Sequence, residues 1–255
     1  MFSDDQSNDG GFLGNFWTKV AHGFSPAIIE GETCQIYHEG SNGVSIEIEK
    51  LNKSFGDHHV LKDIDLSIKP GETFSIIGPS GTGKSLLLKH IVKLIEADSG
   101  RIIINGHDID DPAARNGASD FRYSMVFQSS ALFNSLTVGE NVGLWLREKR
   151  ICAEVRIRRI IHEKLRLVGL EGKEELRTSE LSGGMKKRVA IARSLAMNPD
   201  LILYDEPPAE LDPVTSDELA RVIMSLKDKV KLTTIIVSHD LHFALYLSDR
   251  VALIQ

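Results

Sequence analysis

The chain has 255 residues, of which 42% are hydrophobic and 26% charged, and its formal net charge is −6. This length and composition allow one large hydrophobic core, or one core with a smaller subdomain. No apolar run approaches the roughly 18 to 20 residues that a membrane-spanning helix needs, so any membrane role requires a partner. The acidic net charge argues against a nucleic-acid-binding protein, which would carry a basic excess.

The first 43 residues differ in composition from the rest. They are rich in Gly, Ser, Asn and Asp and contain one apolar patch, formed by Phe12, Leu13, Phe16, Trp17 and Val20. We expect residues 1–43 to form a flexible N-terminal extension, with a short amphipathic helix that docks on a partner as the alternative. The two cysteines, Cys34 and Cys152, are far apart and predict no disulfide framework.

From Val44 onward the apolar pattern predicts alternating strands and helices. Alternation around a turn near Gly56 indicates antiparallel strands, and the continuous apolar run 73–77 indicates a buried strand that enters a glycine-rich loop. Helical periodicity follows at 85–95 and dominates 138–169. The other predicted strands are 101–104, 123–127, 201–204, 234–237 and 251–254, and the other predicted helices are 184–197 and 215–229.

The glycine-rich loop carries the first functional signal. It reads Gly78, Pro79, Ser80, Gly81, Thr82, Gly83, Lys84 and Ser85, the pattern of a phosphate-binding loop between a strand and a helix. Its glycines let backbone N–H groups point at phosphate oxygens, and the helix N-terminus adds partial positive charge. Lys84 is expected to reach the β and γ phosphates of a nucleotide, and the Ser85 hydroxyl to bind Mg²⁺.

A second signal is the apolar run 201–204, which ends in two carboxylates. Ligands bind at the carboxyl ends of strands in open parallel sheets, so Asp205 is expected to hold Mg²⁺ and Glu206 to act as the general base that activates water. Apolar strands that end in Asp-Glu are common, so this motif gains its meaning from the phosphate-binding loop.

A third motif, at residues 181–185, indicates a particular protein family. Leu181, Ser182, Gly183, Gly184 and Met185 precede a predicted helix, where Ser182 can cap the helix and the glycines leave N–H groups exposed for an anion. A plain helix cap is the alternative. The segment resembles the signature motif of ATP-binding cassette (ABC) ATPases, and the resemblance covers residues 44–255.

The resemblance assigns roles to single residues. Gln128 matches the glutamine that senses Mg²⁺ and the γ-phosphate, Asp212 matches the loop that crosses to a partner subunit, and His239 matches the switch histidine. Phe55 matches the aromatic that stacks on adenine, with a core aromatic as the alternative. The expected catalytic residues are therefore Glu206, His239, Gln128 and Lys84. The expected metal ligands are Ser85, Gln128 and Asp205. Those expected to bind ATP are Phe55, residues 78–85, Leu86, Gln128, Ser182, Gly183, Gly184 and Asp212.

The resemblance also implies a fold and partners. The fold is an α/β phosphate-loop NTPase in residues 44–255, with a mixed core sheet, an N-terminal antiparallel β subdomain and a small helical subdomain at about 138–180. Two such chains, most simply a homodimer, would close on ATP and Mg²⁺ with Ser182 of one facing Gly78 of the other. A membrane permease would complete a transporter, peripheral to the cytoplasmic face of the inner membrane.

The segments 128–142 and 180–188 resemble the Mla and Mce branch of this family, which implies a phospholipid or other lipid cargo and a lipid-binding Mce-domain partner. The alternatives are an ATPase of a different importer and a soluble ATPase outside transport. Two residues depart from the family pattern, Pro208 and Glu210, the latter where glycine is usual. The basic stretch 147–166 is either a solvated helix face or a contact with anionic lipid.

Overall fold

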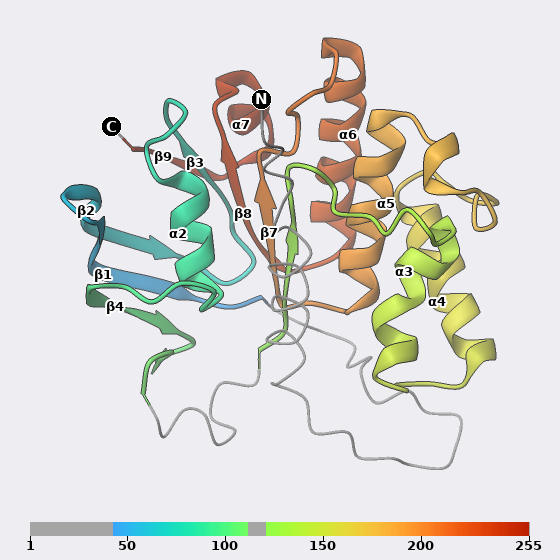
Figure 1. Ribbon diagram of the computed structural model, residues 1–255, viewed down its shortest axis with the longest axis horizontal. Coiled ribbons are helices and arrows are strands. Elements are labelled where there is room, and N and C mark those ends of the chain that lie inside the picture. Colours follow the sequence, from blue (N-terminus) through green and yellow to red (C-terminus); the bar gives the residue numbers. More distant parts are fainter. Residues whose placement is uncertain (1–42, 112–120, 255) are drawn as a thin grey trace, which may run out of the picture.

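A computed structural model describes residues 43–111 and 121–254 of the chain (Figure 1). Its strands are β1 (Ile46–Phe55), β2 (His58–Ile68), β3 (Thr73–Ile77), β4 (Ser99–Ile104), β5 (His107–Asp108), β6 (Tyr123–Val126), β7 (Leu201–Asp205), β8 (Thr233–Ser238) and β9 (Arg250–Leu253). Its helices are α2 (Lys84–Ile91), α3 (Val138–Glu148), α4 (Glu154–Leu167), η2 (Thr178–Glu180), α5 (Gly183–Ala196), α6 (Pro213–Lys229) and α7 (Leu241–Leu247). The expected N-terminal extension lies outside the described residues, except for Gly43.

An antiparallel sheet has the strand order β2-β1-β4-β5. Ile46 and Ile48 of β1 are buried while Glu47 between them is exposed, which is the alternation of a half-buried strand. The turn between β1 and β2 joins the pair Phe55 and His58, as the pattern around Gly56 predicts. The antiparallel β subdomain expected from the sequence is therefore confirmed.

The second sheet has the order β6-β7-β8-β3-β9, and its described pairs are all parallel. The sequence predicted a mixed core sheet. In the described residues the core sheet is instead parallel, and the antiparallel pairs belong to the other sheet. The strands β3, β7 and β8 are almost fully buried, which explains their continuous apolar sequences. Helix α2 contacts β7 and β8, while α7 contacts β3 and β8.

The helical region lies to one side of the parallel sheet, where α3 packs on both α4 and α5 (Figure 1). Helix α3 begins with a capping box, in which Thr137 and Glu140 satisfy each other's backbone N–H groups. The basic stretch is partly neutralised, because Arg147 and Arg158 pair with Glu154 at 2.7 and 3.5 Å. Part of this stretch is therefore an ion-paired helix surface.

Several local features differ from the sequence-based expectation. Helix α7 was missed because it has only seven residues; Asp240 caps it by accepting a 3.0 Å hydrogen bond from the Phe243 N–H. The predicted helix 85–95 ends earlier, at Ile91. Of the two cysteines, Cys34 lies outside the described residues, so the expectation of no disulfide framework remains a prediction. Among the described helices, none is long and apolar enough to cross a bilayer.

A fully buried hydroxyl joins the two sheets. Thr233, the first residue of β8, accepts hydrogen bonds from the N–H groups of Val44 at 2.8 Å and Gly71 at 3.0 Å. It donates to the carbonyl of Val44 at 2.7 Å. The start of the antiparallel sheet is thus fixed to the core of the parallel sheet through one side chain.

Replacing Thr233 by Val should lower the free energy of unfolding by about 1–3 kcal/mol, because two buried N–H groups lose their acceptor while the side-chain volume is kept. Urea unfolding followed by circular dichroism measures this change. The matched control is Thr234→Val on the same buried strand, whose hydroxyl takes no part in this contact and whose replacement should cost less. Equal losses for the two variants would contradict the role of Thr233.

Candidate ATP site

Three neighbouring parallel strands bring the predicted site residues to one edge of the sheet. In the register of β3, β8 and β7, Ile77 pairs with Ser238 and Asp205 with Val237. The residues that follow these strands, Gly78, Glu206 and His239, are therefore neighbours, although they are far apart in sequence. The backbone N–H of Glu206 also donates to the Val237 carbonyl at 3.0 Å.

The loop between β3 and α2 has the backbone that a phosphate site needs. Gly81 and Gly83 have φ angles of 87° and 91°, in the left-handed region that favours glycine. A Cβ on Gly83 would also approach the Leu61 side chain to 2.9 Å. Gly83 is the residue that precedes α2, so the N–H groups of the helix start face the loop. Backbone donors and a helix N-terminus suit a nucleotide phosphate.

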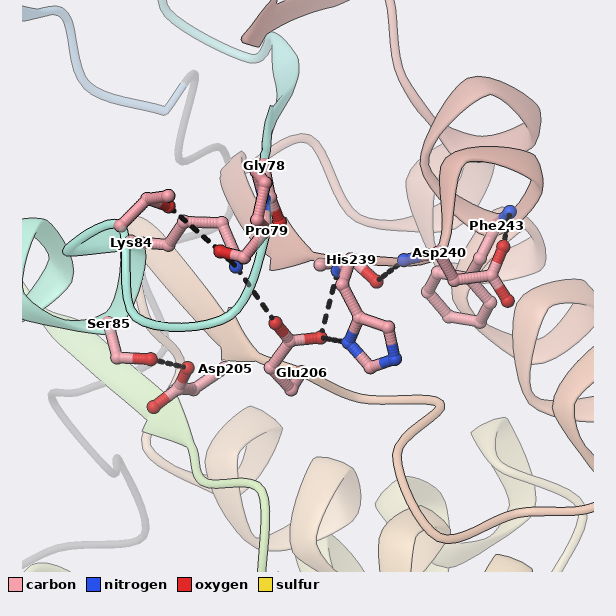
Figure 2. Close-up of polar contacts among 11 residues, drawn as sticks. Gly78, Pro79, Lys84, Ser85, Asp205, Glu206, His239, Asp240 and Phe243 are labelled. Atoms are coloured by element: carbon pink, nitrogen blue, oxygen red, sulfur yellow. Dashed lines mark hydrogen bonds and ion pairs between the residues drawn. The ribbon is translucent and has the colours of Figure 1, made fainter. Parts of the chain in front are cut away.

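Lys84 is buried and turned into the loop. Its ammonium donates to the carbonyls of Gly78 and Pro79, both at 2.9 Å, and lies 3.4 Å from Glu206 Oε1 (Figure 2). A buried ammonium held by three oxygens is poised for an anion at the same place. Phosphate binding would exchange these oxygens for phosphate oxygens.

Ser85 and Asp205 form the next part of the site. The Ser85 hydroxyl donates to Asp205 Oδ1 at 2.5 Å. Burial raises the pKa of Asp205, and the Ser85 hydrogen bond acts against that rise. A buried carboxylate beside a hydroxyl supplies the hard oxygen ligands that Mg²⁺ prefers, so these two residues fit the predicted metal site.

Glu206 and His239 are joined directly. Glu206 Oε2 accepts hydrogen bonds from His239 Nδ1 at 2.8 Å and from its backbone N–H at 3.0 Å (Figure 2). Glu206 has a φ of 47°, which is unusual for a residue other than glycine and turns the chain sharply after β7. The strained turn gives one carboxylate both Lys84 and His239 as partners.

Two other predicted residues lie apart from this cluster. Gln128 is exposed at the end of β6, and its backbone carbonyl, not its side chain, has a described hydrogen bond, from Lys187. Its predicted role as a metal ligand remains a prediction. Phe55 is 52% exposed with the Lys53 ammonium 5.6 Å from its ring, so it is not a core aromatic. An exposed ring can stack on adenine.

The signature segment lies elsewhere on the chain. Ser182 caps α5 by accepting from the Met185 N–H at 3.3 Å, as predicted, and α5 stands well to the side of α2 in Figure 1. Asp212 caps α6 by accepting from the N–H groups of Val214 and Thr215, both at 3.1 Å. The described contacts of Asp212 are structural, and its predicted role at a subunit boundary remains a prediction.

Sequence reasoning gave no role to two buried cations of α5, Lys187 and Arg193. Both donate to backbone carbonyls of the loop after β6: Lys187 to Gln128, and Arg193 to Ser130 at 2.9 Å and Ala131 at 2.7 Å. Burial lowers the pKa of Arg193 to about 10. Lys187 stands within a Lys-Lys-Arg run whose composition resembles a solvated helix face, so its burial was not evident from the sequence.

A protein-family model described as ABC transporter matches residues 61–209, which include the phosphate-binding loop, the signature segment and the Asp205–Glu206 pair. The chain belongs to the ABC transporter family. The α/β fold with an antiparallel β subdomain, expected from the sequence resemblance, is the fold of this family's cassettes.

Two curated relatives show the breadth of the family. The chain is 41% identical over 214 residues to the "Probable ribonucleotide transport ATP-binding protein mkl" of Mycobacterium bovis, covering 83% of this chain and 59% of that protein. It is 44% identical over 195 residues to "Protein TRIGALACTOSYLDIACYLGLYCEROL 3, chloroplastic" of Arabidopsis thaliana, covering 74% and 56%. The chain thus spans less than two thirds of the length of these relatives.

A solved ABC cassette has the same fold. The structure titled "Dimeric structure of a post-hydrolysis state of the ATP-binding cassette MJ0796 bound to ADP and Pi" aligns with a TM-score of 0.71 and 32% sequence identity. The alignment covers 82% of this chain and 94% of that one. The likeness extends over nearly the whole of that cassette.

Replacing Lys84 by Met should weaken binding of a fluorescent ATP analogue at least about tenfold, because an ammonium held among anion-binding groups is lost. Equilibrium fluorescence titration in the presence of Mg²⁺ measures the dissociation constant. Lys62→Met, at an exposed position of β2, is the matched control and should bind as the unmodified chain does. Unchanged affinity in Lys84→Met would contradict the assignment of the phosphate site.

Proposed function

We propose that the chain binds and hydrolyses ATP as the motor subunit of an ABC transporter. The observation that carries this proposal is the cluster at the ends of β3, β7 and β8, where Glu206 lies within reach of both Lys84 and His239. Bound Mg²⁺ would supply charge neutralisation at the phosphates. Ser85 and Asp205 are the residues that would hold it.

The proposed chemistry is water attack on the γ-phosphate. Glu206 is the general base, since its carboxylate can accept the proton of an attacking water once its hydrogen bonds are exchanged. Lys84 would move from the carbonyls of Gly78 and Pro79 to phosphate oxygens and stabilise their charge. His239 holds Glu206 by two hydrogen bonds and can itself reach toward the γ-phosphate, because its side chain is about half exposed.

A second copy of the chain would complete the site. The separation of α5 from α2 within one chain supports this, because Ser182, Gly183 and Gly184 then offer their N–H groups to a neighbour's nucleotide. ATP held between two chains joins them, and hydrolysis removes that attraction. The resulting opening and closing is the movement that a separate membrane permease would use.

Replacing Glu206 by Gln should lower kcat for ATP hydrolysis at least about 100-fold, because the amide cannot accept the water proton. ATP affinity should not fall, since the variant removes a negative charge from beside Lys84. ATP should also drive the variant into a stable dimer. Steady-state phosphate release, fluorescence titration and size-exclusion chromatography measure the three effects.

The matched control is Glu218→Gln on the exposed side of α6, which should hydrolyse ATP at the unmodified rate. Full ATPase activity in Glu206→Gln would refute the assigned base. Loss of activity together with loss of ATP binding would instead point to a binding role for Glu206.

We further propose that the transported substrate is phospholipid or another lipid, and that a Mce-domain protein and a permease are partners at the cytoplasmic face of the inner membrane. Two observations favour this. Segments 128–142 and 180–188 resemble the Mla and Mce branch, and the printed name of the Arabidopsis relative includes the name of a glycolipid. The printed name of the mycobacterial relative, ribonucleotide transport, supplies the competing substrate class.

Purification of the tagged full chain from detergent-extracted membranes of its own host, followed by lipid and protein mass spectrometry, tests the cargo. The lipid proposal predicts that a permease co-purifies with the chain and that the ATPase activity of the complex, after reconstitution in vesicles, rises with added phospholipid and not with ribonucleotides. Stimulation by ribonucleotides alone would favour the competing cargo. Recovery of no membrane protein would favour an ATPase outside transport.

A further inference from the structure

Helix α5 holds the loop after β6 by two buried cations, and one of them reaches the predicted sensor residue itself. Lys187 is 4% exposed, and its ammonium donates to the backbone carbonyl of Gln128. Arg193, two turns further along, donates to the carbonyls of Ser130 and Ala131. Ser130 and Ala131 have φ angles of 63° and 45°, a strained arrangement that the guanidinium contacts help to maintain.

Lys187 is also rigidly connected to the start of α5. Ser182 is joined to the first turn of this helix by two hydrogen bonds. Its hydroxyl accepts from the Met185 N–H, and its carbonyl accepts from the Lys186 N–H at 2.9 Å. Lys187 follows one turn later. The Gln128 carbonyl is therefore connected through Lys187 to the helix that carries Ser182.

The charges around Lys187 connect it to the hydrolytic edge. Burial lowers the pKa of Lys187, while the carboxylates of Glu210 and Asp205 oppose that change. Glu210 has a φ of 67°, a conformation better suited to glycine, which is also the residue usual in the family here.

We propose that Lys187 is a positioning residue for ATP hydrolysis: its hydrogen bond to the Gln128 carbonyl ties the Gln128 loop to the helix that begins at Ser182. This inference rests on the proposed ATPase function. In the described contacts, the Lys187 ammonium touches neither the phosphate-binding loop nor Glu206, so its effect on hydrolysis would be indirect.

The first test compares Lys187→Met with Lys187→Arg and with the neighbouring control Lys186→Met. Lys187→Met should lower kcat for ATP hydrolysis at least about tenfold and leave KM and the affinity for a fluorescent ATP analogue within about twofold, because the phosphate-binding loop is not altered. Lys187→Arg retains a donor and should recover most of kcat. Lys186→Met should match the unmodified chain.

If Lys187→Met fails to fold, Lys187→Gln takes its place, because it removes the ammonium and keeps a polar side chain. It should lower kcat relative to the control Lys186→Gln, and equal kcat in these two variants would overturn the role of Lys187.

Amide hydrogen exchange separates this inference from the proposed function, since it needs no turnover. Exchange in residues 128–134 should accelerate at least about tenfold in Lys187→Met and not in Lys186→Met. If the unmodified chain hydrolyses no ATP, the proposed function is wrong. The exchange measurement still tests whether Lys187 holds the Gln128 loop. If the unmodified chain hydrolyses ATP, and Lys187→Met has the same kcat and the same amide exchange rates as Lys186→Met, the role of Lys187 is wrong and the proposed function stands.

Discussion

The shared carboxylate of Glu206 is the interaction on which the site depends. It lies between a buried ammonium, Lys84, and the imidazole and backbone N–H of His239. These three residues come after three different strands, Lys84 after β3, Glu206 after β7 and His239 after β8. A buried carboxylate is costly unless it is paired, so the cluster is favourable only when all three strand ends are in place. In the proposed mechanism the same pairing controls the chemistry, because Glu206 would become available as a base once Lys84 turns to phosphate.

The parallel sheet provides that placement through its register. Because β3 pairs with β8 and β8 with β7, the residues after these strands emerge side by side at one edge. Thr233 then fixes the antiparallel sheet to β8, which keeps Phe55 and its strand attached to the core that carries the phosphate-binding loop. Helix α5 is tied to this assembly separately, through Lys187 and Arg193. Among the described residues, the sheet edge that carries the proposed catalytic groups and the helix that begins at Ser182 are thus held by separate contacts.

Much of this arrangement follows from the sequence, and the exceptions have physical reasons. The run 73–77 and the motif 78–85 predict the strand, loop and helix because glycine spacing and apolar continuity are local signals. The all-parallel character of the core sheet and the short helix α7 depend on tertiary pairing and on one cap, Asp240, which local periodicity does not reveal. Lys187 lies between two other basic residues, Lys186 and Arg188, which are only partly buried, and only packing distinguishes it from them. The predicted roles of Ser182 and Asp212 toward ATP concern a second copy of the chain, as the proposed function has it, so one chain does not display them. The predicted role of Gln128 as a ligand of Mg²⁺ in its own chain remains a prediction.

A crystal structure of the full chain with Mg²⁺ and a non-hydrolysable ATP analogue tests the central claim most directly. The account predicts that Lys84 Nζ leaves the carbonyls of Gly78 and Pro79 and binds β- and γ-phosphate oxygens, while Glu206 keeps its contact with His239 and faces the γ-phosphate. An analogue bound away from residues 78–85, or Lys84 still held by Gly78, Pro79 and Glu206 with the analogue present, would contradict it.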